Sequence, residues 1–262
     1  MIELADIGIN KSDNVTHVAD LAPAYSFDFE SLSSVVKTII SSRQRRIPIV
    51  DKNSHLVGIL TYMDIIDAIL RGISKNTKIS TFMIRETVFC ETTESIGLVL
   101  QKMKISRRGG FPVVKNTKLI GMVSEKDFIK LVYGKYLGIA VNELMTHRPL
   151  FLKPETTIHD CMKAMVNTHY RRFPVISRNE TVGMVTGIDV LRYLNEIDYT
   201  PSHLNKSIEH IMSTPVIFVS EHDDISDAVK LIIENEVGGL PVINEENMLK
   251  GIITERDIIN II

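Results

Sequence analysis

The chain has 262 residues, of which 44% are apolar, enough to bury a sizeable core in one or two domains. Its 30 basic and 32 acidic residues nearly balance, so the composition gives no electrostatic footprint for duplex nucleic acid or an anionic membrane. No apolar stretch reaches membrane-spanning length, and Glu3 and Asp6 stand where a signal peptide would be basic and then apolar. We therefore expect a soluble cytoplasmic protein in which Cys90 and Cys161 are buried free thiols.

The first predicted elements follow one another without long interruptions. Helical periodicity runs over residues 32–47. Two short apolar strands follow at 48–50 and 56–60, separated by the polar turn 51–54. The second strand leads directly into another predicted helix at 62–70. With an apolar stretch before the first helix, the predicted module is strand, helix, strand, strand, helix.

This module recurs three more times along the chain. Four prolines, 64, 62 and 67 residues apart, each open an apolar run: Pro48, Pro112, Pro174 and Pro241. An apolar residue lies sixteen positions before each proline: Leu32, Ile96, Ile158 and Ile225. A glycine follows each proline by nine or ten residues: Gly58, Gly121, Gly183 and Gly251. Such a period indicates supersecondary modules stacked on one another.

A hydroxyl and an aspartate, three residues apart, follow every glycine. The pairs are Thr61 and Asp64, Ser124 and Asp127, Thr186 and Asp189, and Thr254 and Asp257. Helix capping would use both groups, but capping alone favours Glu or Gln at the third helical position. An ionised aspartate has two acceptor oxygens that suit the vicinal hydroxyls of a ribose. The helix N-terminus beside it favours a phosphate.

The residues before the prolines alternate between two kinds. Repeats 1 and 3 carry arginine pairs and repeats 2 and 4 carry glycine pairs: Arg45–Arg46, Arg171–Arg172, Gly109–Gly110 and Gly238–Gly239. Guanidinium groups bind phosphate bidentately, although at most one neighbour of a pair on a strand faces a given cleft. The glycines could form a bend, or could let a flat base or a ribose approach the backbone.

The alternation indicates that the higher unit is a pair of repeats and that the chain holds two pairs. A single module has too little chain for a good core, so we expect paired modules to pack sheet against sheet. The predicted domains are residues 15–72, 79–133, 141–194 and 208–262. Residues 133–140 would join the two pairs, and residues 195–207 would be a linker inside the second pair.

The four patterns in register, covering nearly the whole chain, resemble four cystathionine-β-synthase (CBS) domains. The alternation further resembles archaeal four-repeat proteins similar to the γ subunit of AMP-activated protein kinase. The resemblance implies an α/β fold of four β-α-β-β-α repeats paired into two Bateman modules. It also implies clefts for adenosine-containing ligands and no catalysis. The sequence itself has no nucleophile elbow, P-loop or metal-ligand spacing, so no catalytic residue, catalytic cofactor or metal site is predicted.

The resemblance also implies roles for individual residues. The four aspartates would hold ribose, with the Thr or Ser hydroxyls near ribose or phosphate. The expected phosphate ligands are Arg45, Arg46, Arg108, His169, Arg171 and Arg172. For His169, a surface histidine without a ligand role is an equally good interpretation. Some of Arg43, Arg107 and Arg178 are expected to be solvated surface charges. The adenine pocket, for which core packing is the alternative, falls on Ala24, Met83, Val88, Met145, Leu150, Met212, Ile217, Gly109, Gly110, Gly238 and Gly239.

The expected function is non-catalytic sensing of AMP, ADP or ATP, coupled to an unidentified regulated protein, by a single chain or a homodimer. Mg²⁺ could accompany ATP, but the sequence does not require it. One alternative is an S-adenosylmethionine sensor, which the arginine pairs disfavour because the sulfonium is cationic. Another is a regulatory subunit of a nucleotide-metabolism enzyme. A binder of single-stranded nucleic acid is disfavoured by 6% aromatic residues and a net charge of −2.

Overall fold

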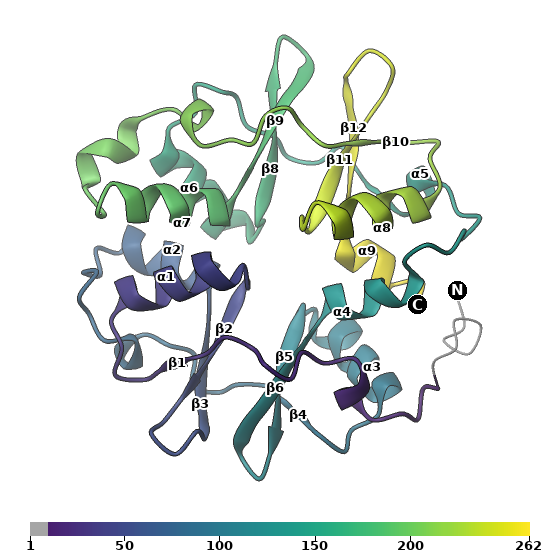
Figure 1. Ribbon diagram of the computed structural model, residues 1–262. Helices are drawn as coiled ribbons and strands as arrows, with labels where there is room; N and C mark the ends of the chain where they lie inside the picture. Colours follow the sequence, from purple (N-terminus) through teal and green to yellow (C-terminus); the bar gives the residue numbers. More distant parts are fainter. Residues whose placement is uncertain (1–9) are drawn as a thin grey trace. The chain divides into compact units, whose positions relative to one another are not determined.

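The computed structural model describes residues 10–262, in which short strands and helices alternate in four repeats (Figure 1). Two compact units are present. Unit 1 contains the described residues up to Pro23, with Val88–Pro149 and Ile217–Ile262, and unit 2 contains Ala24–Thr87 and Leu150–Val216. Unit 1 therefore holds repeats 2 and 4, and unit 2 holds repeats 1 and 3. The predicted α/β class and the four repeats are confirmed.

Unit 2 is built on two groups of helices that pack against each other. Repeat 1 comprises β1 (Ser26–Phe27), α1 (Leu32–Ser42), β2 (Arg46–Val50), β3 (Leu56–Thr61) and α2 (Tyr62–Leu70). Repeat 3 comprises α6 (Ile158–Thr168), β8 (Arg172–Ser177), β9 (Glu180–Thr186) and α7 (Gly187–Glu196). Strand β2 pairs in parallel with β1 and antiparallel with β3, and β8 pairs antiparallel with β9. Helix α2 packs against α6 and α7, so the core joins repeats 1 and 3.

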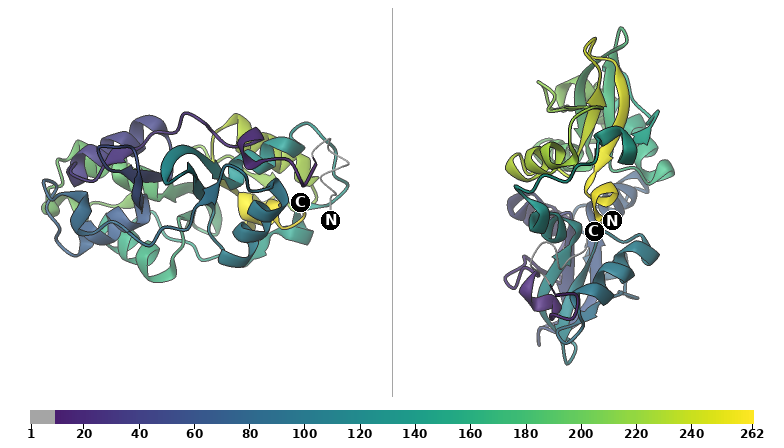
Figure 2. Two further views of the ribbon diagram at one scale, coloured as in Figure 1. Left: turned by 90° about the horizontal axis from the view of Figure 1, so that it is seen from below. Right: turned by 90° about the vertical axis from the view of Figure 1, so that its right-hand side faces the viewer.

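Unit 1 repeats this plan. Repeat 2 comprises β4 (Cys90–Glu91), α3 (Ile96–Ser106), β5 (Gly110–Lys115), β6 (Lys118–Ser124) and α4 (Glu125–Ile129). Repeat 4 comprises β10 (Val219–Ser220), α8 (Ile225–Glu234), β11 (Gly239–Ile243), β12 (Leu249–Thr254) and α9 (Glu255–Ile259), and α5 (Val141–Leu144) and β7 (Thr146–His147) precede repeat 3 in the chain. Helices α4 and α9 pack together at the core. The right view of Figure 2 shows the β11–β12 hairpin extending away from α9.

Local sequence explains where the helices begin and end. Ser31 caps α1 by accepting a hydrogen bond from the Ser34 N–H, and Ser95, Thr157 and Asp224 cap α3, α6 and α8. The helical pattern predicted over residues 32–47 is a helix only over Leu32–Ser42. It ends because Arg43 adopts a left-handed conformation with φ of 55°, after which the chain enters β2.

The segment that leads into each repeat lies on the sheet of a neighbouring repeat. Ile84, which leads into repeat 2, pairs with Ile59 of repeat 1, and Asp20, which leads into repeat 1, pairs with Met122 of repeat 2. Residues 146–147 pair in the same way with repeat 4, and Ser213 pairs with repeat 3. Consecutive repeats thus exchange their leading segments. The predicted packing of consecutive repeats sheet against sheet would involve repeats of different units, so it stays a prediction.

These crossings explain the recurring glycines. A Cβ on Gly121 would lie 2.7 Å from the Asp20 carbonyl oxygen, and one on Gly251 would overlap the side chain of Met145. Only glycine leaves room for the leading segment at these places.

We expect Gly121→Ala to lower the free energy of unfolding by about 1–3 kcal/mol, because the added methyl group would be overpacked against the leading segment at Asp20. Urea unfolding would measure the change. Lys118→Ala, at an exposed position of the same strand, is the control and should change it little. Equal stability of both variants would contradict this account.

Candidate functional site

Each of the four aspartates takes part in a capping box at the start of its helix. One carboxylate oxygen, Oδ2, accepts hydrogen bonds from both the backbone N–H and the side-chain hydroxyl of the N-cap residue. For Asp64 both bonds to Thr61 measure 2.7 Å, and for Asp257 the bonds to Thr254 measure 2.8 and 2.7 Å. Asp127 and Asp189 make the same bonds at 2.6–2.9 Å. Capping therefore accounts for one oxygen of every aspartate.

The second oxygen, Oδ1, differs among the repeats. In Asp127 it lies 3.3 Å from Lys130 Nζ, and in Asp189 it lies 3.8 Å from Arg192 Nη1. Within residues 10–262, no hydrogen bond or ion pair involves Oδ1 of Asp64 or Asp257. These two carboxylates thus retain an acceptor for a ligand hydroxyl.

Burial acts on two of the aspartates. It raises the pKa of Asp189 and of Asp257, against the opposing effect of the hydrogen bonds from Thr186 and Thr254. Negative charge from Glu125 also raises the pKa of Asp257. The surroundings of these two carboxylates therefore disfavour their charged form.

The alternating arginines and glycines lie directly across the strand ladder from the capping hydroxyls. Arg46 pairs with Thr61 and Arg172 pairs with Thr186. Gly110 and Gly239 hold the corresponding places opposite Ser124 and Thr254. In repeats 1 and 3 the residue across from the capping hydroxyl is therefore an arginine, and in repeats 2 and 4 it is a glycine without a side chain.

The residue before each of these four acts through its backbone. The carbonyl oxygens of Arg45, Gly109, Arg171 and Gly238 each accept the N–H of the first residue of the following helix, at 3.1–3.3 Å. In α2 and α7 the N-cap hydroxyl also accepts the N–H of the third residue. Few amides therefore remain for a ligand at the N-termini of α2 and α7.

Two further predicted phosphate ligands lie just after helices. His169 follows α6 with φ of 58° and is exposed, and Arg108 is exposed in the loop between α3 and β5. Among the described residues, neither side chain makes a hydrogen bond or ion pair with an aspartate. Their phosphate role stays a prediction.

The predicted adenine residues fall into two structural groups. Met83 and Met145 are 7% exposed, and a Cβ placed on Gly58, Gly183 or Gly251 would lie close to the sulfur of Met83, Met212 or Met145 respectively. Each of these methionines therefore lies on a strand of a different repeat from its own. Val88, Leu150 and Ile217 are 37–53% exposed. In repeat 1, the Gln44 side-chain amide faces the backbone N–H and carbonyl of Ala24 at 3.2 and 3.1 Å, and it pairs with both when its amide is oriented with the oxygen toward the N–H.

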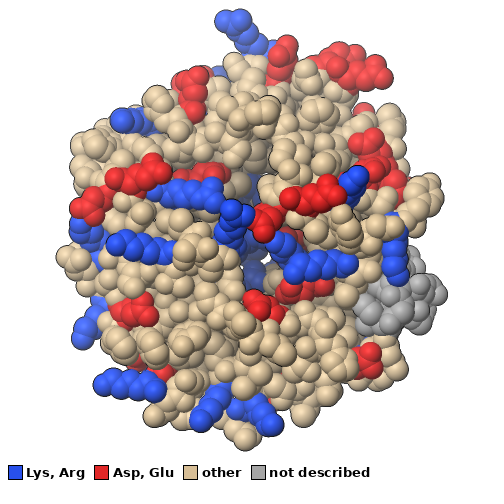
Figure 3. All heavy atoms as spheres, in the orientation of Figure 1, with Lys and Arg blue, Asp and Glu red and all other residues tan. Residues whose placement is uncertain are grey.

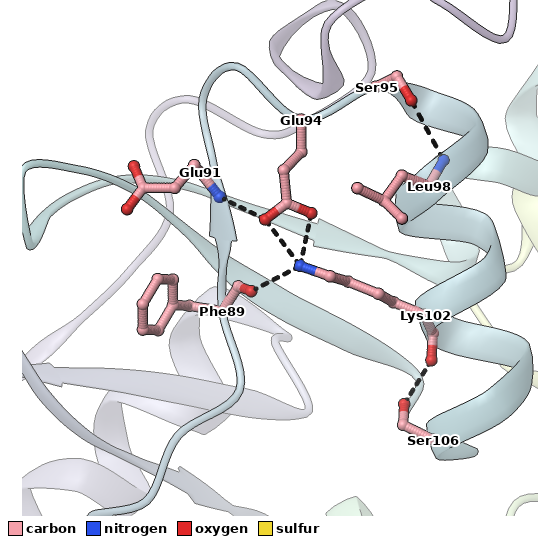
Figure 4. A network of polar contacts seen from close by, with 7 residues as sticks. All are labelled: Phe89, Glu91, Glu94, Ser95, Leu98, Lys102 and Ser106. Carbon is pink, nitrogen blue, oxygen red and sulfur yellow. Dashed lines mark hydrogen bonds and ion pairs between the residues drawn. The ribbon is translucent and has the colours of Figure 1, made fainter.

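A polar network fixes the segment that carries Val88 in repeat 2 (Figure 4). Lys102 Nζ lies 2.7 Å from Glu94 Oε1 and donates to the Phe89 carbonyl at 3.4 Å. Glu94 Oε1 also accepts the Glu91 N–H at 3.1 Å. The network ties β4 to helix α3 and thereby holds the position of the segment before β4.

A pocket of about 540 Å³ in unit 1 brings one aspartate together with cations. It is lined by Met103, Lys104, Arg107, Glu125, Thr146, Arg256, Asp257, Ile259 and Asn260. Asp257 comes from repeat 4, whereas Lys104 and Arg107 come from repeat 2. Within the described residues, the side chains of Lys104 and Arg107 make no hydrogen bond or ion pair. We call this cavity the repeat-4 pocket.

The sequence does not assign Lys104, Glu125 or Arg256 to a site, and it places Arg107 in a group of three arginines of which some are expected to be solvated surface charges. Arg107 adopts φ of 53° at the end of α3, and the residues that follow α1, α6 and α8 have the same conformation: Arg43, His169 and Glu236. This backbone conformation recurs in all four repeats, so it does not by itself distinguish Arg107.

Residues 10–262 contain no group of three or more His, Cys, Asp and Glu side chains arranged to hold a metal ion. No helix in the same range is long and apolar enough to cross a membrane.

Known proteins resemble this chain over most of its length. A relative from Methanocaldococcus jannaschii, uncharacterised protein MJ1225, is 26% identical over 257 residues, covering 87% of this chain and 91% of the relative. Its crystal structure, described as that of a proposed archaeal homologue of γ-AMPK, covers 95% of this chain and 99% of its own at a TM-score of 0.88 and 24% identity. A Thermofilum pendens protein of 33.4 kDa is 26% identical over 256 residues, covering 87% of this chain and 85% of its own.

Partial matches include a structure of the CBS-pair protein CBSX2 of Arabidopsis thaliana in complex with AMP, covering 47% of this chain and 96% of its own at a TM-score of 0.43 and 29% identity. The sequence model of the CBS domain matches four segments, residues 27–71, 79–134, 141–196 and 208–262. The chain therefore belongs to the CBS-domain family and contains four copies of the domain.

Proposed function

We propose that this protein is a non-catalytic sensor of adenine nucleotides that regulates a partner protein. The observation that carries the proposal is the repeat-4 pocket, where Asp257 lies in one cavity with Lys104 and Arg107. Its volume of about 540 Å³ falls within the usual range of small-molecule sites. MJ1225, which is similar to this chain over most of its length, is described as a proposed archaeal homologue of γ-AMPK, and this description agrees with a regulatory role.

The chemistry of a nucleoside phosphate fits the groups in this pocket. Oδ1 of Asp257 can accept a ribose hydroxyl while Oδ2 continues to cap the helix. Lys104 and Arg107 lie where they can receive a phosphate without first giving up another partner. Arg46 and Arg172 would serve the phosphates of the ligands of repeats 1 and 3.

Two other ligand classes fit less well. The sulfonium of S-adenosylmethionine would place a positive charge in a pocket that already holds two unpaired cations. A single-stranded nucleic acid would require a continuous basic surface with aromatic side chains. On the face drawn in Figure 3, basic and acidic side chains are interspersed instead.

Calorimetric titration of the ligand-stripped protein with AMP, ADP, ATP and S-adenosylmethionine tests the proposal. We expect saturable heats with the nucleotides and at least about tenfold weaker binding of S-adenosylmethionine, because a misplaced charge costs more than 1.4 kcal/mol. Mg²⁺ should be present in one ATP series and absent from another. No heat with any of the three nucleotides would overturn the proposal, and tighter binding of S-adenosylmethionine would replace it with the second ligand class.

A further inference from the structure

The charged side chains of the repeat-4 pocket fall into two sets. Lys104 and Arg107 are unpaired within the described residues, and they lie in the same cavity as Asp257. Arg256 is instead paired with Glu125, a residue of repeat 2. A carboxylate beside a phosphate site is unfavourable in itself, so the presence of Glu125 requires an explanation.

All three guanidinium nitrogens of Arg256 are engaged. Nε donates to Glu125 Oε1 at 2.7 Å, and Nη2 lies 2.6 Å from the same oxygen. Nη1 donates to the carbonyl oxygen of Arg107. An arginine binds phosphate through these same N–H groups. These contacts use three of the five N–H groups of the guanidinium, and Glu125 occupies its Nε–Nη2 edge. Arg256 therefore cannot offer this edge to a phosphate while the pair with Glu125 persists, and Glu125 offsets its positive charge.

Glu125 cannot easily release its partner. It is the first residue of α4, and its side chain is only 6% exposed. Removing the partner of a buried charge is strongly destabilising, because the remaining charge is left without solvent or a counter-ion. In unit 2 the corresponding helix positions hold Tyr62 and Gly187, and a Cβ on Gly187 would lie 2.4 Å from the Tyr62 ring. The acidic residue is thus a feature of unit 1.

We propose that Glu125 is a specificity-determining residue of the repeat-4 pocket, because it occupies the Nε–Nη2 edge of Arg256 and offsets its charge, which leaves two unpaired cations in the pocket for the phosphate end. The inference rests on the proposed function. It follows that this pocket favours a nucleoside monophosphate over a triphosphate. Each added phosphate brings further negative charge, and Glu125 both offsets the charge of Arg256 and repels the phosphates directly.

The test compares AMP and ATP in the wild type and in Glu125→Gln, which keeps the shape of the side chain and removes its charge. The ¹³C-methyl NMR signals of Met103 and Ile259, which line the cavity, report binding at this pocket rather than at the other repeats. We expect the wild type to bind AMP at least about tenfold more tightly than ATP. In Glu125→Gln, ATP affinity should rise about tenfold and AMP affinity by less than about threefold. Glu180→Gln, at an exposed hairpin position, is the control.

An unchanged ratio of AMP to ATP affinity in folded Glu125→Gln, or a wild-type pocket that prefers ATP, would overturn the inference. If neither nucleotide shifts these methyl signals in the wild type, the proposed nucleotide function of the pocket fails instead. Should Glu125→Gln fail to fold, the double variant Glu125→Gln with Arg256→Gln removes both charges together. Its AMP affinity should stay within about threefold of the wild type. A larger loss would mean that Arg256 contacts the ligand and would contradict the inference.

Discussion

Replacing Asp257 with asparagine should weaken nucleotide binding at the repeat-4 pocket about 10- to 100-fold, because a hydrogen bond to a charged acceptor contributes about 1.5–3 kcal/mol. The same variant should keep or raise the melting temperature. An asparagine carbonyl oxygen can still accept both bonds from Thr254, so the helix cap survives. Methyl NMR titration with AMP and thermal unfolding without ligand would measure the two effects separately.

The stability effect of Asp257→Asn has a defined dependence on pH. Burial raises the pKa of Asp257, so the folded protein takes up this proton before the unfolded chain does as the pH falls. The stability gained from protonation is complete below the unfolded pKa and is lost as the pH rises through the folded pKa. Asparagine never ionises. Its advantage over the wild type should therefore be largest at neutral pH and approach zero below about pH 4.

Asp257→Ala is the matched control for this prediction. It removes the ribose acceptor and the cap together, so it should lose binding and also about 1 kcal/mol of stability. If Asp257→Asn binds AMP as tightly as the wild type, the carboxylate serves capping alone. If Asp257→Asn is less stable than the wild type at neutral pH, its charge contributes to folding in a way that the burial of this group does not explain.

The repeats were predictable because they rest on local chemistry. The same residue types recur in register because each has a local structural role. Pro48 lies on a strand, Gly58 leaves room for the leading segment, and Thr61 and Asp64 form the helix cap. The exchange of leading segments was not predictable. Nothing in the sequence says that the room made by Gly58 is filled by Met83 of the next repeat.

The residues that line the repeat-4 pocket could not be predicted from the sequence either. Asp257 could be singled out by its recurrence, but Lys104 and Glu125 lie in another repeat and gain meaning only when α3, α4 and α9 come together. Arg256 similarly reads as an ordinary surface arginine until its bond to Glu125 is seen. Contacts between distant parts of the chain depend on tertiary packing, which residue spacing within a repeat does not encode.

Arg107→Gly should have opposite effects on stability and binding. Arg107 holds φ of 53° at the end of α3, a conformation that costs a residue with a Cβ about 1–2 kcal/mol and glycine almost nothing. After allowance for the greater flexibility of glycine in the unfolded chain, we expect a gain of about 1 kcal/mol in the free energy of unfolding. Loss of the guanidinium should weaken AMP binding at the repeat-4 pocket about tenfold or more, because a charged hydrogen bond to phosphate is lost.

Ser54→Gly separates the two effects. Ser54 has φ of 65° in the β2–β3 turn, so glycine should stabilise the fold there for the same backbone reason and leave binding unchanged. Urea unfolding would measure the free energy of unfolding of both variants, and titration would measure their affinity for AMP. A rise in stability at both positions with a loss of binding only in Arg107→Gly would mean that the guanidinium of Arg107 serves the ligand although its backbone conformation costs stability. Equal binding in the two variants would return Arg107 to the status of a solvated surface charge and would leave Lys104 as the one unpaired cation of the pocket within the described residues.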